Sequence, residues 1–423
     1  MLSYHFPPLG GSGSMRVLRL GRYLPEFGWK PLVVSVAGGG QEPRDPGLLT
    51  QVPPEAEVHR VRCLEPDDFS DSWSHPRQKV VRNLFKTFDF LLFPDDRAFW
   101  IGPAASRARR LAREHGPAAI WATGPPFSTM VAGLRVHRRT GLPLILDFRD
   151  DWTGFNERFR SRSPVRQARE EDLERQCLQA ASAVLSVTPG IVEALRQRRP
   201  EGVPEDRFHL LPNGFDPAHF PDPGPRRAPG EPFRIVHAGS LYSNRSPGPF
   251  LEGLRLWLDA SPPERRQQVR VRFLGRVEPG LEPLFEGQGL QDVVERVPFV
   301  PHARALDEVR GADLLLLVVD QVQKAEQIYT GKVFEYLGSQ RPILALLPLD
   351  SPLADLLRES GVGRLASPRE PEAIARALEE AWTARENPPR PNPEVLARFS
   401  ARSQAGLLAG LLDRVLETRR GPD

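Results

Sequence analysis

The sequence predicts an α/β protein that contains two doubly wound halves. A strand, a glycine-bearing loop and a helix follow one another at the start of the chain, and the same order returns from residue 233. This repeat is typical of parallel sheets that are covered by helices on both faces. A Pro-rich segment, residues 221–232, separates the halves. The length of 423 residues also exceeds what one hydrophobic core usually supports, so we expect two domains.

The first half opens on a strand and a glycine-rich loop. Residues 1–4 have the pattern of the end of a strand, so we expect the natural start of the chain to lie further upstream. The next loop contains Gly10, Gly11, Ser12 and Gly13. Glycines in such a loop let backbone N–H groups approach an anion closely. The elements expected after it are helix 15–27, strand 30–36, helix 103–115, strand 118–123, a helix that opens at 124–129 and runs to 140, strand 142–147 and strand 183–187.

The second half repeats this order. Its expected elements are strand 233–237, loop 238–246, helix 247–258, strand 269–274, an extended segment at 297–300, helix 303–310, strand 312–319, and helices 371–384 and 393–418. Ligands of open α/β sheets bind at the carboxyl ends of the strands. Loops 10–13, 123–129 and 147–152 follow strands of the first half. We therefore expect a ligand cleft between the two halves.

The stretch 329–347 (YTGKVFEYLGSQRPILALL) carries the sharpest local signal. The chain has only five lysines among its 57 basic residues, and one of them, Lys332, stands at the start of a helix with Glu335 one turn later. A loop that leads into a helix offers backbone N–H groups and a positive dipole end, which suit phosphate. The alternative is an ordinary αβ unit with a surface lysine.

Two nucleotide motifs and one cluster of charges can be tested on the sequence. A G-x-G-x-x-G motif from Gly11 would need glycine where Arg16 stands, and the P-loop pattern would need glycine at Glu326. Neither a dinucleotide dehydrogenase nor a P-loop NTPase is therefore supported. Charged residues follow the strand at 142–147, and they either bind a ligand or form helix caps and surface ion pairs. These residues are Asp147, Arg149, Asp150 and Asp151.

Composition limits the partners and the compartment. The 57 basic and 54 acidic side chains leave a formal charge of +3, which argues against nucleic acid as a main partner. Cys63 and Cys177 are too few for a disulfide framework and lack metal-ligand spacing, so we expect reduced thiols in a cytoplasmic protein. Residues 77–93 form a basic amphipathic segment. It is either a helix on a membrane surface or a surface helix packed on its own domain.

Eight motifs in order resemble those of family-4 glycosyltransferases of the GT-B fold, most of all the type that builds bacterial surface polysaccharides. They are PPLGGSG, GPPFST, DFRDDW, LPNGFD, HAGSL, FLG, VPFVPH and TGKVFEYL. The resemblance implies two Rossmann-like domains that face each other across a cleft. It also implies four segments: an N-terminal acceptor-binding domain at 1–220, a linker at 221–232, a C-terminal nucleotide-sugar-binding domain at 233–395, and a helix at 396–423 that crosses back to the N-terminal domain.

The resemblance also implies a reaction, namely retaining transfer of a sugar from a UDP- or GDP-sugar without an essential metal or a cofactor. Arg245 and Lys332 would neutralise the departing diphosphate. Glu335 matches the second Glu of the family's E-x₇-E motif and would hold the ribose hydroxyls, whereas Gln327 replaces the first Glu. Further donor contacts would come from the loop 10–13 and from Gly239, Ser240, Gly275, Thr330 and Gly331.

The acceptor would be a glycan or a lipid-linked intermediate at the inner face of the membrane. Asp147, Arg149 and Asp150 would lie on its side of the cleft, and Arg149 and Met130 stand where many relatives carry histidine. Two other functions remain open. Gln327 and Met130 motivate a non-catalytic binding or scaffold subunit. A nucleotide-sugar epimerase is the third, and the nine histidines of the chain argue against its acid–base chemistry.

Overall fold

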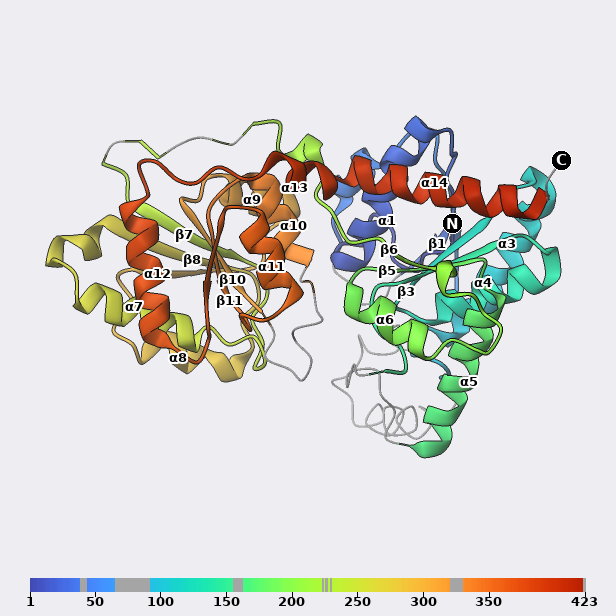
Figure 1. Ribbon diagram of the computed structural model, residues 1–423, viewed down its shortest axis with the longest axis horizontal. Coiled ribbons are helices and arrows are strands. Elements are labelled where there is room, and N and C mark those ends of the chain that lie inside the picture. Colours follow the sequence, from blue (N-terminus) through green and yellow to red (C-terminus); the bar gives the residue numbers. More distant parts are fainter. Residues whose placement is uncertain are drawn as a thin grey trace. The chain divides into compact units, whose positions relative to one another are not determined.

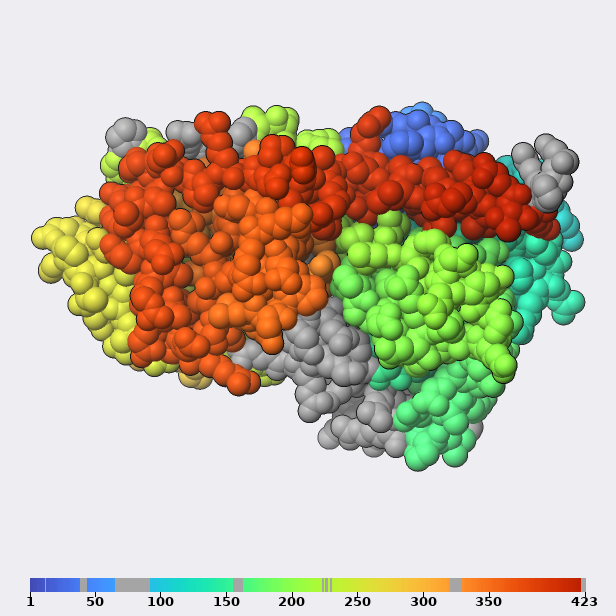
Figure 2. All heavy atoms as spheres, in the orientation of Figure 1, coloured from blue at the N-terminus to red at the C-terminus, as the bar shows by residue number. Residues whose placement is uncertain are grey.

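The computed structural model describes residues 1–38, 44–64, 92–154, 163–222, 224, 227–228, 230–319, 329 and 331–420. The chain divides into two compact units (Figures 1 and 2). The first unit consists of Met1–Pro212 and Gln404–Asp423, and the second of Asn213–Ser403. The chain thus passes to the second unit eight residues before the boundary expected at 220, and returns at 404 instead of 396.

The first unit is built on parallel strands. They are β1 (Leu32–Val36), β2 (Glu57–Val61), β3 (Ile120–Gly124), β4 (Leu144–Phe148), β5 (Ala183–Ser186) and β6 (Phe208–Leu210). β1 pairs with β2, and β3 to β6 pair in sequence order. Leu2 bridges Val34 of β1 on one side and Ala122 of β3 on the other. The N-terminal segment therefore lies at the point where the strand order reverses, which is where such sheets bind ligands.

Helices complete this unit. They are α1 (Ser12–Tyr23), α3 (Ile101–His115), α4 (Ser128–Thr140), α5 (Pro164–Ala180), α6 (Pro189–Gln197) and α14 (Ala401–Arg420). Capping residues mark several of their starts; Thr188, for example, accepts a hydrogen bond from the Ile191 N–H at 3.3 Å. α14 lies along the surface of this unit (Figure 2), where Gly406 sits against the Phe27 ring and Trp29 donates to Asp413.

The second unit has a six-stranded parallel sheet in the order β12-β11-β10-β7-β8-β9. The strands are β7 (Phe233–Ala238), β8 (Val269–Leu274), β9 (Val294–Val297), β10 (Leu314–Val318), β11 (Ile343–Leu346) and β12 (Gly363–Ala366). The order again reverses, between β7 and β10. A crevice at the carboxyl ends of these two strands is therefore the expected ligand position in this unit.

Two helix layers cover this sheet (Figure 1). α7 (Gly248–Asp259), α8 (Glu282–Glu286) and α12 (Pro371–Thr383) lie on one side, and α9 (His302–Arg310), α10 (Gly331–Ser339) and α11 (Pro352–Glu359) on the other. The apolar run of β10 shows why both sides are covered. Leu314 and Leu316 belong to the core under α7 and α12, and Leu315 and Leu317 to the core under α9 to α11.

The helix expected at 393–418 is two helices, α13 (Pro393–Arg398) and α14. Between them Ser400 forms a β-bridge with Phe215, whose N–H donates to Phe399 O at 3.0 Å and whose carbonyl accepts from Ala401 N at 2.7 Å. The extended segment expected at 297–300 lies earlier, as β9, because Val294 to Val297 pair with β8.

Candidate functional site

The glycine-rich loop of the first unit leads directly into a helix at the reversal point of the sheet. α1 begins at Ser12 and its N-cap residue is Gly11, which has a φ of 80°. The first N–H groups of a helix have no partner within the helix. The segment Gly10 to Gly13 therefore brings backbone donors to the carboxyl end of the sheet, as expected for an anion-binding loop.

Arg149 joins this loop to the one that follows β3. Its guanidinium donates to Gly13 O at 2.7 Å and to Pro125 O. Burial lowers the pKa of Arg149, while the carboxylates of Asp147 and Asp150 act in the opposite direction. Arg149 thus fixes the relative position of two loops at the reversal point. Asp150 follows it, partly exposed at the carboxyl end of β4.

Asp147 has a different position from the one expected. Its side chain is fully buried and accepts hydrogen bonds from Arg16 through both oxygens, and from Thr123 at 2.8 Å. A carboxylate so enclosed has no surface to offer an acceptor hydroxyl, so its role here is structural. Asp151 is also buried and pairs with Arg198, so it forms an ion pair, but a buried one and not the surface pair that the sequence suggested.

In the second unit, Lys332 lies against the end of β7. A Cβ added at Gly239 would collide with Cε and Nζ of Lys332, so the lysine rests on the Gly239 backbone. Gly275, which follows β8, packs on the same residue: a Cβ there would lie 2.7 Å from the Gly239 carbonyl carbon. Both glycines have left-handed φ angles, of 136° and 130°. Only glycine readily adopts such φ angles and also leaves room for so close an approach by neighbouring atoms.

The pKa of His237 reflects the charges around the carboxyl end of β7. This residue is fully buried in β7, and its Nδ1 lies 2.9 Å from Leu316 O. Burial lowers its pKa well below the usual value, and the positive charges of Lys332 and Arg245 lower it further. Lys332, which rests on Gly239, thus places a positive charge at the carboxyl end of β7. The partly exposed Ser240 and Arg245 belong to the loop that leaves this point.

Glu335 has a partner that the sequence did not suggest. His302 Nε2, at the start of α9, lies 2.9 Å from Glu335 Oε1 on α10, and each side chain is 21% exposed. His302 is the last residue of the VPFVPH motif. Its partner Glu335 lies 33 residues further along the chain, so the pairing depends on how α9 and α10 pack and not on the motif.

Several expected residues fall outside the described part of the chain. These are Thr330, Gln327 and Glu326 beside α10, and 77–91 of the basic amphipathic segment. Gly331 is the first residue of α10 and is exposed. Within the described residues, no group of three or more His, Cys, Asp or Glu side chains is placed to hold a metal ion.

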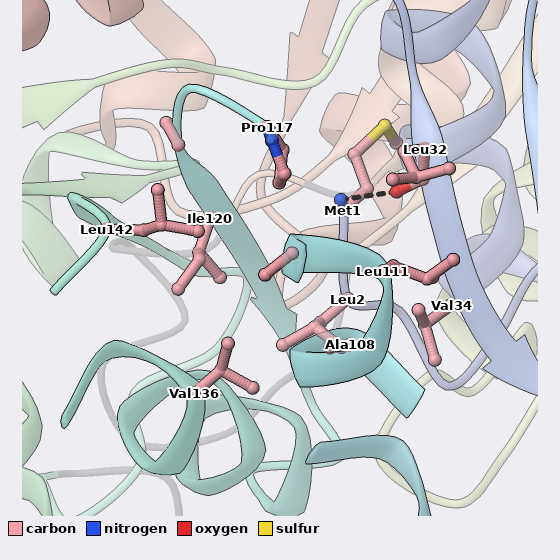
Figure 3. Close-up of a pocket in the computed structure, with 12 residues that line it drawn as sticks. Met1, Leu2, Leu32, Val34, Ala108, Leu111, Pro117, Ile120, Val136 and Leu142 are labelled. Atoms are coloured by element: carbon pink, nitrogen blue, oxygen red, sulfur yellow. Dashed lines mark hydrogen bonds between the residues drawn. The ribbon is translucent and has the colours of Figure 1, made fainter. Parts of the chain in front are cut away.

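The first unit also has a small apolar pocket whose lining does not include Asp147, Arg149 or the loop 10–13 (Figure 3). Its lining includes Leu32 and Ile120, the first residues of β1 and β3, and Met1, which donates to Leu32 O at 2.7 Å. The pocket is therefore at the amino ends of the strands, opposite the loops described above. We do not assign it to the candidate site.

Known proteins resemble both the sequence and the fold. Residues 11–214 match the family model described as "Glycosyl transferase 4-like domain". No curated protein matches the sequence. Among solved structures, HepE from Anabaena in complex with UDP and glucose has a TM-score of 0.58 at 16% identity, and the alignment covers 100% of this chain and 99% of that one.

Two further structures have the same fold. The α,α-trehalose-phosphate synthase (UDP-forming) from Burkholderia xenovorans, in complex with glucose-6-phosphate, has a TM-score of 0.62 at 11% identity, with 97% and 99% of the chains covered. The lipopolysaccharide outer core galactosyltransferase WaaB has a TM-score of 0.55 at 10% identity, with 99% and 98% covered. At these identities the likeness shows the fold, and it confirms the expected GT-B class.

Proposed function

We propose that this chain, a glycosyltransferase that belongs to the glycosyl transferase 4-like family through residues 11–214, takes its sugar from a UDP- or GDP-linked donor. The observation that carries the proposal is the position of Lys332, whose Cε and Nζ lie against the Gly239 backbone at the end of β7. The positive charge of Arg245, in the loop that follows β7, lowers the pKa of the buried His237 in the same direction as that of Lys332. Charge develops on a departing diphosphate during sugar transfer, so fixed cations at this point stabilise the transition state.

The nucleotide is proposed to lie over the carboxyl ends of β7 and β8. Because Gly239 and Gly275 have no side chains, Lys332 packs directly on the backbone there, and its charge lies at the carboxyl end of the sheet. Glu335, on the helix that also carries Lys332, would accept hydrogen bonds from the ribose hydroxyls. The UDP bound in HepE favours a uridine donor by analogy of fold.

We further propose that transfer retains the anomeric configuration and needs neither a metal nor a cofactor. The bond between the anomeric carbon and the phosphate oxygen breaks, and the bond to the acceptor oxygen forms on the same face. The leaving phosphate takes the acceptor proton, so no protein base is required. Arg245 and Lys332 supply the charge that a metal ion would otherwise provide at the diphosphate.

The acceptor is proposed to be a glycan or a lipid-linked intermediate of surface polysaccharide synthesis, on the cytoplasmic face of the membrane. The loops joined by Arg149 would receive it. None of the described helices combines the length and the apolar character that a membrane span requires. Contact with the membrane surface is proposed for the basic amphipathic segment 77–93, most of which lies outside the described residues.

Release of UDP or GDP in the presence of a cell-derived acceptor tests the proposal. Wild-type protein should release one of them from a matching nucleotide sugar, and Arg245→Ala should abolish release while leaving the melting temperature unchanged. Arg369→Ala, at an exposed position of the same unit, is the control and should keep full activity. Equal release by wild type and Arg245→Ala would refute the assignment of the diphosphate site.

A further inference from the structure

His302 and Glu335 form a polar pair between two helices of the second unit. His302 opens α9, which precedes β10, and Glu335 lies in the second turn of α10, which follows it. The distance from Nε2 to Oε1 is 2.9 Å, and each side chain keeps about a fifth of its surface exposed. The pair is therefore anchored in the protein but reachable from solvent.

A second imidazole ring, that of His219, contacts the His302 ring on a different side from Glu335. His219 meets His302 edge to face, with 5.7 Å between the ring centroids. His219 belongs to a segment that packs on α10: a Cβ added at Gly338 would lie 2.6 Å from the Phe215 ring. The imidazole of His302 is thus bounded by α10 and by the segment that rests on it, which limits its rotation.

We propose that His302 is a positioning residue that orients the Glu335 carboxylate toward the ribose hydroxyls of the donor. This inference rests on the proposed function, because it assigns Glu335 to the ribose. A carboxylate accepts hydrogen bonds through two oxygens, and a donor fixed on Oε1 sets the direction in which Oε2 points. Holding a binding group by a neighbour's hydrogen bond is a general way to keep it in the productive geometry.

The chemistry requires an N–H donor at the place of Nε2. An imidazole that carries its proton on Nε2 supplies it, and a glutamine amide supplies one with a similar reach. Leucine fills a similar volume without a donor. His302→Gln should therefore preserve the orientation of Glu335, and His302→Leu should release it.

Isothermal titration with UDP and GDP, and with the 2′,3′-dideoxy form of whichever binds, tests the inference. Wild type should bind the ribose nucleotide more tightly than the dideoxy one. His302→Leu should lower the affinity for the ribose nucleotide by about tenfold, which is the cost of one charge-assisted hydrogen bond. It should leave the affinity for the dideoxy nucleotide unchanged. His302→Gln should stay close to wild type on both.

A matched pair elsewhere gives the control. His59 Nε2 lies 2.8 Å from Glu57 Oε1 in the first unit, so His59→Leu removes a similar contact and should leave nucleotide affinity unchanged. An equal loss of both nucleotides in His302→Leu, or no loss, would overturn the positioning role. Failure of wild type to bind either UDP or GDP would overturn the proposed function and this inference with it.

Discussion

Arg16 and Asp147 form a buried, two-point ion pair in the first unit. Arg16 Nε lies 2.9 Å from Oδ2 and Nη2 lies 2.8 Å from Oδ1, and the side chains are 2% and 0% exposed. Arg16 also donates to the carbonyls of Leu211 and Pro212, the last two residues before the chain enters the second unit. One guanidinium thus ties α1, β4 and the residues that lead into the second unit.

Breaking this pair should destabilise the first unit strongly. Asp147→Ala leaves a buried guanidinium without its counter-charge, which costs roughly 3–5 kcal/mol of unfolding free energy. Urea denaturation measures the loss. The double change Arg16→Met with Asp147→Leu should recover most of it, because both charges are then absent. A single variant that unfolds at the wild-type urea concentration would contradict the structural role given to Asp147.

Gly239 should tolerate no side chain. In Gly239→Ala the new methyl group must displace Lys332, and alanine is strained at a φ of 136°. We expect nucleotide affinity to fall by at least about tenfold, since the lysine loses its place at the diphosphate. Gly280→Ala, where a Cβ meets nothing within 4 Å, is the matched control and should bind normally. Equal affinities in the two variants would show that Lys332 does not need this position.

Arg149 should affect turnover but not nucleotide binding. Arg149→Met removes the donors to Gly13 O and Pro125 O and releases two loops of the first unit. In our proposal the nucleotide contacts Lys332, Arg245 and Glu335 of the second unit, whereas the loop 10–13, which the resemblance placed on the donor, receives the acceptor. We therefore expect kcat to fall by about tenfold or more, as misplaced groups near a reaction commonly cause, while the Kd for nucleotide stays unchanged. An equal loss of nucleotide affinity would contradict the assignment of nucleotide binding to the second unit.

His237 should make the stability of the second unit depend on pH. Its pKa in the folded protein is well below that of an unfolded histidine, chiefly through burial. Its contribution is therefore complete above about pH 6.5 and is lost below it, at about 1.4 kcal/mol per pH unit, until the folded pKa is reached. Unfolding free energies at about pH 7.5 and pH 5.5 should show this loss in wild type and a smaller one in His237→Gln. Identical losses would contradict a neutral, buried imidazole.

The fold was predictable where one local pattern dominated. The LLLLV run of β10 and the two strand–loop–helix repeats indicated a parallel α/β chain with two halves. β2 was missed because its residues, Glu57 to Val61, are charged or only partly buried and show no apolar run. The break in the C-terminal helix was missed because it depends on pairing between Phe215 and Phe399, which are distant in sequence.

The sequence identified single residues of the candidate site but not the contacts between them. Motif positions singled out Lys332, Arg245 and Glu335, but nothing in the spacing shows that Lys332 rests on Gly239. His302 and Arg16 were not assigned roles, since their partners lie 33 and 131 residues away and meet them only through the strand order. Asp147 was assigned to the acceptor because a strand-end carboxylate looks the same in sequence whether it is exposed or paired.

Isothermal titration of UDP and GDP against wild type, Lys332→Ala and Lys30→Ala tests the central claim most directly. Lys30 is an exposed lysine of the first unit and serves as the control. We predict that wild type and Lys30→Ala bind one of the two nucleotides equally, and that Lys332→Ala binds it at least about tenfold more weakly through the lost charge at the diphosphate. Binding of neither nucleotide by wild type, or equal binding by all three proteins, would contradict a nucleotide-sugar site at the end of β7.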